Sequence, residues 1–152
     1  MDAKEYTELI KRHIASCQYL EENPHFPAPI QIPENNPSAL YWRDQIYLRD
    51  GYCLDISDWA LFEDGEMVER SFFYDFRKID GRKLIWRICN HRRQQPVTAG
   101  CHVHANADNE KDINEFFPDS INTIFPYAVH CVKNFYEGKP QEWEVGHNVE
   151  NV

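Results

Sequence analysis

Three Asp-Gly pairs divide the middle of the chain into short segments, and their spacing narrows the folds that the chain can adopt. They are Asp50-Gly51, Asp64-Gly65 and Asp80-Gly81. Such a pair favours a type I′ hairpin turn, because both central residues of that turn need positive φ. The segments around the pairs alternate apolar and polar residues, as half-buried strands do, over residues 41–49, 52–62, 67–77, 83–89 and 101–104. The pattern therefore predicts an antiparallel meander of four or five strands.

An amphipathic helix is predicted on each side of these strands. Residues 4–22 repeat apolar side chains at close to 3.6-residue spacing, and charged side chains occupy the opposite side. Asp119 or Ser120 can cap a second helix that runs to Tyr136, with Pro126 either kinking that helix or starting it. We therefore expect an α+β fold in which both helices cover one face of the meander.

The length of 152 residues suits a single domain with its own core. Five of the nine prolines lie between residues 23 and 38, and so many prolines exclude a helix or a central strand there. We expect an N-terminal helix over residues 1–22, a proline-rich arm over 23–39, one α+β domain over 40–137 and a polar tail over 138–152.

Composition argues against several classes of protein. The six glycines form no Gly-rich phosphate loop, which argues against a nucleotide-binding α/β enzyme. The five cysteines are odd in number and widely spaced, and they include no Cys-x-x-Cys pair, which argues against a disulfide framework and a zinc ribbon. No basic and apolar leader opens the chain, and no apolar run approaches the ~20 residues of a membrane span. We expect a reduced, cytoplasmic protein without membrane contact.

Charge is unevenly distributed along the chain. A basic stretch over residues 66–104 carries eight basic and four acidic side chains, whereas the whole chain has a net charge of −9. A local excess of positive charge beside histidines suits a phosphate-bearing ligand such as RNA. The acidic flanks suit a basic protein partner, with a homodimer as the alternative. The basic stretch also has a simpler interpretation, in which strands turn Lys and Arg outward for solubility.

The candidate site lies in this basic stretch. Arg87, Cys89 and His91 are alternate residues of one predicted strand, so they point to the same side, and His102 and His104 share a side of the next. Pairing of the two strands would bring Arg87 and the histidines together. The set predicts a metal-independent, ribonuclease-like site. In it Arg87 stabilises the phosphorane, and two of the three histidines act as general base and general acid.

Neighbouring residues have supporting roles in this hypothesis, and no cofactor is expected. Arg92 or Arg93 would add positive charge beside Arg87. Tyr74 or Glu69 would orient one imidazole.

Two other hypotheses use the same residues. The His102-x-His104 pair can bind zinc, iron or manganese, with His91 or Glu110 as the third ligand. Alternatively, the chain is a non-catalytic binding or regulatory module, whose histidines are structural or hold a ligand passively. Metal analysis and a double His-to-Ala change at residues 102 and 104 distinguish these hypotheses.

Over roughly residues 50–136 the sequence resembles the TumE-like toxins of prokaryotic toxin–antitoxin pairs. The runs that carry the likeness are ERSFFYDFR from Glu69, DGRKLIWRICNH from Asp80 and the HVH of residues 102–104. In that family an aromatic strand precedes a strand of the pattern D-G-x-L-I-F-R-x-D-N-x-x-H. An H-x-H follows, and a C-terminal helix closes the domain.

The resemblance implies a growth-inhibiting toxin whose partner is a helix-turn-helix antitoxin. Its most specific part is the set of Arg87, His91 and the His102-x-His104 pair. Two positions depart from the family pattern. Cys89 stands where the family usually has an aspartate, and His91 follows the preceding asparagine directly instead of after two more residues.

Overall fold

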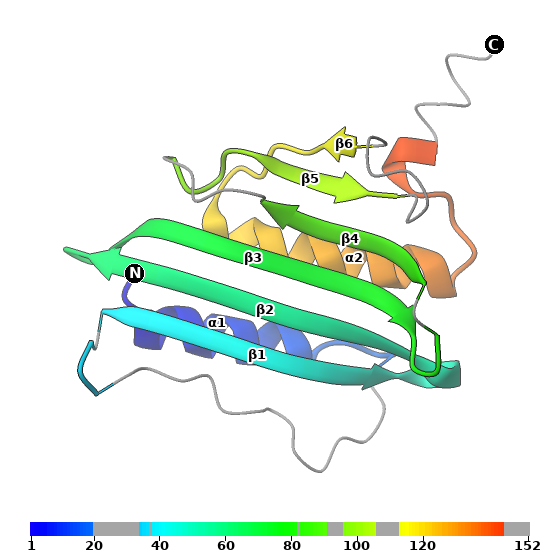
Figure 1. The fold of residues 1–152 in the computed structure, drawn as a ribbon, viewed down its shortest axis with the longest axis horizontal. Helices are drawn as coiled ribbons and strands as arrows, with labels where there is room; N and C mark the ends of the chain where they lie inside the picture. Colours follow the sequence, from blue (N-terminus) through cyan, green and yellow to red (C-terminus); the bar gives the residue numbers. More distant parts are fainter. Residues whose placement is uncertain (20–33, 37, 82, 91–95, 106–112, 145–152) are drawn as a thin grey trace.

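The computed structural model describes residues 1–19, 34–36, 38–81, 83–90, 96–105 and 113–144. Its centre is a sheet in which every strand pairs antiparallel with its neighbour in sequence (Figure 1). The strands are β1 (Ala39–Leu48), β2 (Tyr52–Glu63), β3 (Glu66–Lys78), β4 (Leu84–Asn90), β5 (Cys101–His104) and β6 (Ile113–Glu115). Helices α1 (Ala3–Ala15) and α2 (Ile124–Tyr136) complete the fold.

The predicted α+β meander is confirmed, but within the described ranges the sheet has six strands instead of four or five. The additional strand, β6, is three residues long and pairs with β5 at the edge of the sheet. Three residues are too few to show the alternation of apolar and polar side chains by which a strand is predicted.

The first two Asp-Gly pairs lie at hairpin connections, as predicted: Asp64-Gly65 forms a two-residue turn, whereas Asp50-Gly51 belongs with Arg49 to a three-residue connection. Asp50-Gly51 has φ of 62° and 81°, and Asp64-Gly65 has φ of 51° and 76°. Asp80-Gly81 does not form such a turn, since neither residue has positive φ. The connection between β3 and β4 is longer, and the Arg77 guanidinium donates hydrogen bonds to the carbonyls of residues 78, 79 and 81. Arg77 therefore shapes this loop in place of a two-residue turn.

Helix α1 is shorter than predicted. It begins with a capping box, in which the side chains of Asp2 and Glu5 each accept from the backbone N–H of the other residue. It ends at Ala15, after which the backbone N–H of Cys17 bonds to the carbonyl of Ile14 in a tighter turn. The prediction that the helix continues beyond Ala15 is therefore wrong for residues 16–19, and residues 20–22 lie outside the described residues.

Helix α2 follows a 3-10 turn over residues 121–123, which Ser120 caps. Pro126 lies in the first turn of α2, where backbone N–H groups have no partner within the helix, so the missing N–H of proline is tolerated. Of the two alternatives predicted for Pro126, a helix that starts near this residue is the correct one. No helix in the described part of the chain is long and apolar enough to cross a membrane.

Both helices pack against the same face of the sheet, which we call the helix face (Figure 1). Trp42 and Tyr74 on this face meet Phe125 of α2 edge to face, with ring centroids 5.6 and 5.4 Å apart. Ile10 and Ile14 of α1 belong to the same buried cluster. Neither α1 nor α2 covers the opposite face, which we call the open face.

An ion pair is buried within the helix face. Nη2 of Arg70 donates to Oδ2 of Asp58 at 2.8 Å and to the hydroxyl of Tyr74 at 2.7 Å, and both charged side chains are 0% exposed. The hydroxyls of Tyr74 and Tyr6 donate to the same carboxylate oxygen at 2.9 and 3.3 Å. Burial opposes the charge of Arg70, but Asp58 together with the hydroxyls of Tyr6 and Tyr74 outweighs this effect and raises the pKa of Arg70. Arg70 is therefore a structural cation inside the fold.

The Asn90 side chain ties the end of β4 to β3. Its Oδ1 accepts from the backbone N–H of Phe72 at 2.9 Å, and its Nδ2 donates to the carbonyl of Arg70 at 3.0 Å. The side chain is buried, so it takes the place of backbone hydrogen bonds where the strand ends. This anchor also fixes the position of the preceding residue, Cys89.

Candidate functional site

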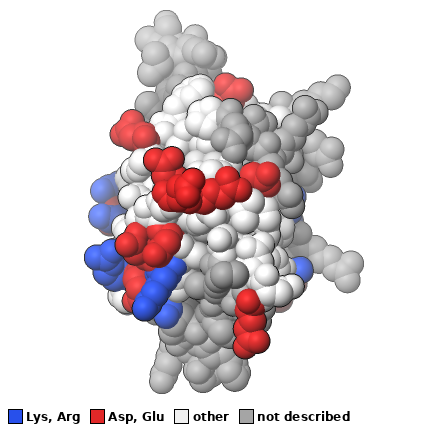
Figure 2. Space-filling model, turned by 90° about the vertical axis from the view of Figure 1, so that its left-hand side faces the viewer, with Lys and Arg blue, Asp and Glu red and all other residues white. Residues whose placement is uncertain are grey.

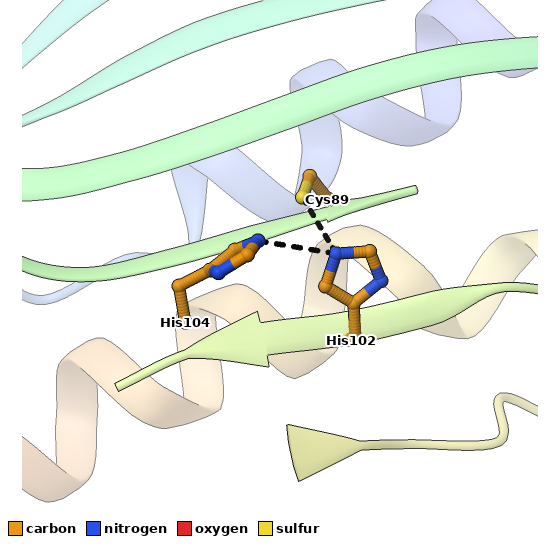
Figure 3. Close-up of side chains that lie close together, drawn as sticks. All are labelled: Cys89, His102 and His104. Atoms are coloured by element: carbon orange, nitrogen blue, oxygen red, sulfur yellow. Dashed lines mark hydrogen bonds between the residues drawn. The ribbon is translucent and has the colours of Figure 1, made fainter. Parts of the chain in front are cut away.

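Strands β4 and β5 place the candidate side chains on the open face. Across the two strands Arg87 pairs with His104, and Cys89 pairs with His102, so the predicted pairing of these strands is confirmed. Residues directly opposite each other in an antiparallel pair point to the same side. The cysteine and both histidines accordingly gather on one side of the sheet, with the helices behind it (Figure 3).

His102 is held through one of its ring nitrogens. Nδ1 lies 2.8 Å from the carbonyl oxygen of Gly100, and because a carbonyl only accepts, Nδ1 carries the hydrogen. In the neutral ring Nε2 is then unprotonated. It faces two groups at 3.2 Å, Sγ of Cys89 and Nε2 of His104 (Figure 3). The lone pair of His102 is therefore directed at the centre of the cluster.

Cys89 is a buried thiol. Burial raises its pKa to about 11, and the nearby Arg87 offsets part of this rise. The metal-free thiol is therefore protonated at neutral pH, and its S–H group can donate to Nε2 of His102. A metal ion that binds the sulfur displaces this proton, because the thiolate is the form that binds metals.

The three potential ligand atoms lie close to one another. Sγ of Cys89 and one ring nitrogen each of His102 and His104 all lie within 4.8 Å. In a tetrahedral zinc site the usual bond lengths place two nitrogens about 3.3 Å apart and a nitrogen about 3.6 Å from a sulfur. The two contacts of 3.2 Å lie close to these values. No fourth His, Cys, Asp or Glu among the described residues joins the group.

Arg87 lies beside the cluster in a two-point salt bridge. Its Nε and Nη2 donate to the two carboxylate oxygens of Asp75 at 2.6 and 2.7 Å. The Arg87 side chain is 39% exposed and that of Asp75 is 8% exposed. The hydrogen bond to Asp75 raises the pKa of Arg87, so the guanidinium keeps its charge. Asp75 largely balances that charge.

The described arginines of the basic stretch do not form an open cationic surface, because each is paired with an aspartate, while the two described lysines, Lys78 and Lys83, are exposed. The pairs are Arg70–Asp58, Arg77–Asp55 and Arg87–Asp75. Figure 2 shows the side of the molecule where the β2–β3 turn lies, with acidic side chains spread across its middle and basic side chains gathered at its lower left. Glu63, Asp64 and Glu66 of this turn are exposed. A count of charges along the sequence thus overestimates the positive charge that a ligand can reach.

Two residues expected to orient an imidazole lie away from the histidines. Tyr74 points to the helix face, where it is fully buried and bonded to Asp58 and Arg70. Glu69 is four residues along β3 from Phe73, the residue that pairs with Cys89. Four residues of a strand span about 13 Å, too far for a hydrogen bond to the histidines. The expected roles of Tyr74 and Glu69 are therefore corrected with respect to His102 and His104, whereas His91 lies outside the described residues.

Other candidates lie outside the described residues, and one member of the cluster is new. His91, Arg92, Arg93 and Glu110 all fall outside the described residues. Cys89, which sequence reasoning placed on the side of Arg87 but did not assign to the site, contacts His102 directly. The signal that could have found it is the register of β4 with β5, which sets Cys89 opposite His102.

The arrangement has two chemical capacities. One sulfur and two imidazole nitrogens form a donor set that suits zinc or copper better than magnesium or calcium. Without a metal, two imidazoles in contact can share and move a proton. Comparison with protein-family models, curated proteins and solved structures gives no match for the chain.

Proposed function

We propose that the protein binds one zinc-class transition metal ion through Cys89, His102 and His104, the three ligands among the described residues, and uses a remaining coordination position to activate water. The observation that carries this proposal is the convergence of one sulfur and two ring nitrogens within 4.8 Å. Three protein ligands with a free fourth position are typical of catalytic zinc sites, where the metal lowers the pKa of a bound water to about 7.

The surroundings of His102 support a metal ligand. Its Nδ1–H group donates to the carbonyl of Gly100, and a hydrogen bond of this kind usually fixes the ring and tautomer of metal-binding histidines. Cys89 and His102 are buried, whereas His104 is only partly buried. A bound metal would therefore be shielded on the thiolate side and reachable beside His104.

Metal content and cobalt binding test the proposal directly. Protein purified without chelator should contain about one equivalent of metal by elemental analysis, and cobalt(II) should produce a sulfur-to-metal charge-transfer band. Cys89→Ser should abolish that band. Cys53→Ser is the matched control, since Cys53 is another buried thiol on the open face, and the band should persist. Wild-type protein that binds neither zinc nor cobalt would overturn the proposal.

A metal-free ribonuclease is the second candidate, and it keeps the chemistry predicted from the sequence. It is supported by the pairing of Arg87 with His104 and by the contact between the two imidazoles. We place it second because the facing Nε2 atoms, 3.2 Å apart, leave no room for a phosphate between them. Arg87 is also already paired with Asp75.

An RNA-cleavage assay with and without EDTA separates the two candidates. A metal centre should lose activity in EDTA and regain it with zinc, whereas a metal-free site should keep it. In a metal-free site His104→Ala should lower the rate by about 10²–10⁴-fold, the usual contribution of a positioned general acid or base, and in a metal site it should lower activity through loss of the metal. RNA left intact under all conditions would remove the ribonuclease candidate. The toxin role, the antitoxin partner and a homodimer stay predictions, tested by growth inhibition, pull-down and light scattering.

A further inference from the structure

Arg87 is placed to reach a ligand bound to the metal. It lies directly opposite His104 in the β4–β5 pair, and the Cβ atoms of such residues are about 4.5–5.5 Å apart. The arginine side chain therefore projects from the open face next to one of the proposed metal ligands.

Asp75 holds Arg87 along one edge of the guanidinium. The salt bridge uses Nε and Nη2, so Nη1 takes no part in it, and the side chain is 39% exposed. The ring of Phe73 lies 5.2 Å from the guanidinium carbon. A guanidinium fixed in this way is pre-organised to donate hydrogen bonds from its remaining edge.

The charge balance favours an anion only when a metal is bound. Asp75 offsets the charge of Arg87, and the shallow cavity that both residues line also contains a second pair, Arg77 with Asp55, and the carboxylate of Asp80, so without a metal its acidic side chains outnumber its arginines. A divalent metal with a single thiolate ligand adds net positive charge beside Arg87. An anion would then face the metal and the guanidinium together.

We infer that the metal-loaded site binds a tetrahedral oxyanion of the phosphate class. One oxygen takes the open coordination position, and another accepts a hydrogen bond from Nη1 of Arg87, a donor that pairs well with phosphate oxygens. Asp75 is a positioning residue that holds the guanidinium for this contact. The inference rests on the metal site proposed above and names the class of ligand that the site takes.

Phosphate titration of the cobalt-loaded protein tests the inference. Inorganic phosphate should shift the visible absorption of the bound cobalt. Arg87→Ala should weaken phosphate binding at least ~10-fold, as expected for one charge-assisted hydrogen bond, while cobalt affinity stays unchanged. Asp75→Asn should weaken phosphate binding less than Arg87→Ala, again at unchanged cobalt affinity. Arg43→Ala, at an exposed arginine of β1 on the same face, is the control and should bind phosphate like the wild type.

The outcomes separate this inference from the metal site itself. Protein that binds no cobalt would overturn both. The inference would be overturned if phosphate did not change the spectrum of the cobalt-loaded protein, or if Arg87→Ala did not lower its affinity for phosphate. Either result would leave the metal site intact. Acetate that binds as tightly as phosphate would also overturn it, because the site would then take any small oxyanion.

Discussion

Two polar clusters lie on opposite faces of the same sheet, and each contains an arginine–aspartate pair. On the helix face Arg70 and Asp58 are both 0% exposed. On the open face Arg87 is 39% exposed and its partner Asp75 is 8% exposed. The same two residue types therefore serve different ends. The buried pair can only hold the fold together, whereas the exposed pair keeps an edge of the guanidinium for a ligand.

Removing Arg70 should have the largest effect on the molecule. Arg70→Met leaves the Asp58 carboxylate buried without its cation, which should cost about 3–5 kcal/mol of the free energy of unfolding. Urea denaturation of the variant measures this cost. Adding Asp58→Leu should recover most of the loss, because the uncompensated charge is then gone. Arg87→Met is the matched change on the open face, and an equal loss there would erase the contrast between the two clusters.

The open-face cluster should contribute to the free energy of unfolding mainly when a metal is bound. In the metal-free protein its mutation should change that free energy much less. Zinc at about 100 times its dissociation constant should raise the free energy of unfolding by about 2.7 kcal/mol. His104→Ala should weaken zinc binding about 100-fold or more and remove this gain. The metal-free variant should unfold within about 1 kcal/mol of the wild type, since His104 is only partly buried. A zinc-induced gain that persists in the variant would contradict the assignment of His104 as a ligand.

Alkaline pH should lower the free energy of unfolding of the metal-free protein, through buried thiols on both faces of the sheet. Burial raises the pKa of Cys89 and of Cys101 to about 11 and that of Cys131 to about 12, from the ordinary value of 9.0. Above pH 9 the unfolded chain loses these protons while the folded chain retains them, so stability falls as pH rises towards 11. Urea denaturation in EDTA at pH 8, 9 and 10 checks the sign. Stability that is flat or rising over this range would show that these thiols are not shielded.

The smallest effect is expected at the second salt bridge of the open face. Arg77 and Asp55 are partly buried, at 20% and 28% exposed, and ion pairs whose members both keep contact with solvent contribute little. Asp55→Asn should therefore change the free energy of unfolding by less than about 1 kcal/mol. A loss comparable to that of Arg70→Met would mean that exposure does not separate the structural pair from the others.

Local turn chemistry explains why much of the fold could be predicted from the sequence. Asp50-Gly51 and Asp64-Gly65 adopt the positive φ that the tight turns need, and each fixes the pairing of two long strands. Asp80-Gly81 carries the same signal, but Arg77 organises a longer loop there through three carbonyls. A rule based on two adjacent residues does not include a side chain of the preceding strand, such as that of Arg77.

The candidate site was only partly predictable, because it depends on a register that no short turn fixes. Alternation alone places Arg87 and Cys89 on one side of β4, and His102 and His104 on one side of β5. The contact between Cys89 and His102 follows only once these two residues are set opposite each other. The burial of Arg70 could not be predicted either, since its partner Asp58 lies on another strand and a charged residue is by default expected at the surface.

The Asn90 anchor also has a consequence for association between molecules. Among the described residues, β3 continues towards its N-terminal end beyond the end of β4, and open backbone groups at the edge of a sheet can pair with a strand of another chain. The amide of Asn90 occupies the N–H group of Phe72 and the carbonyl of Arg70. One side chain thus occupies two backbone groups of β3 that would otherwise be able to pair with a strand of another chain.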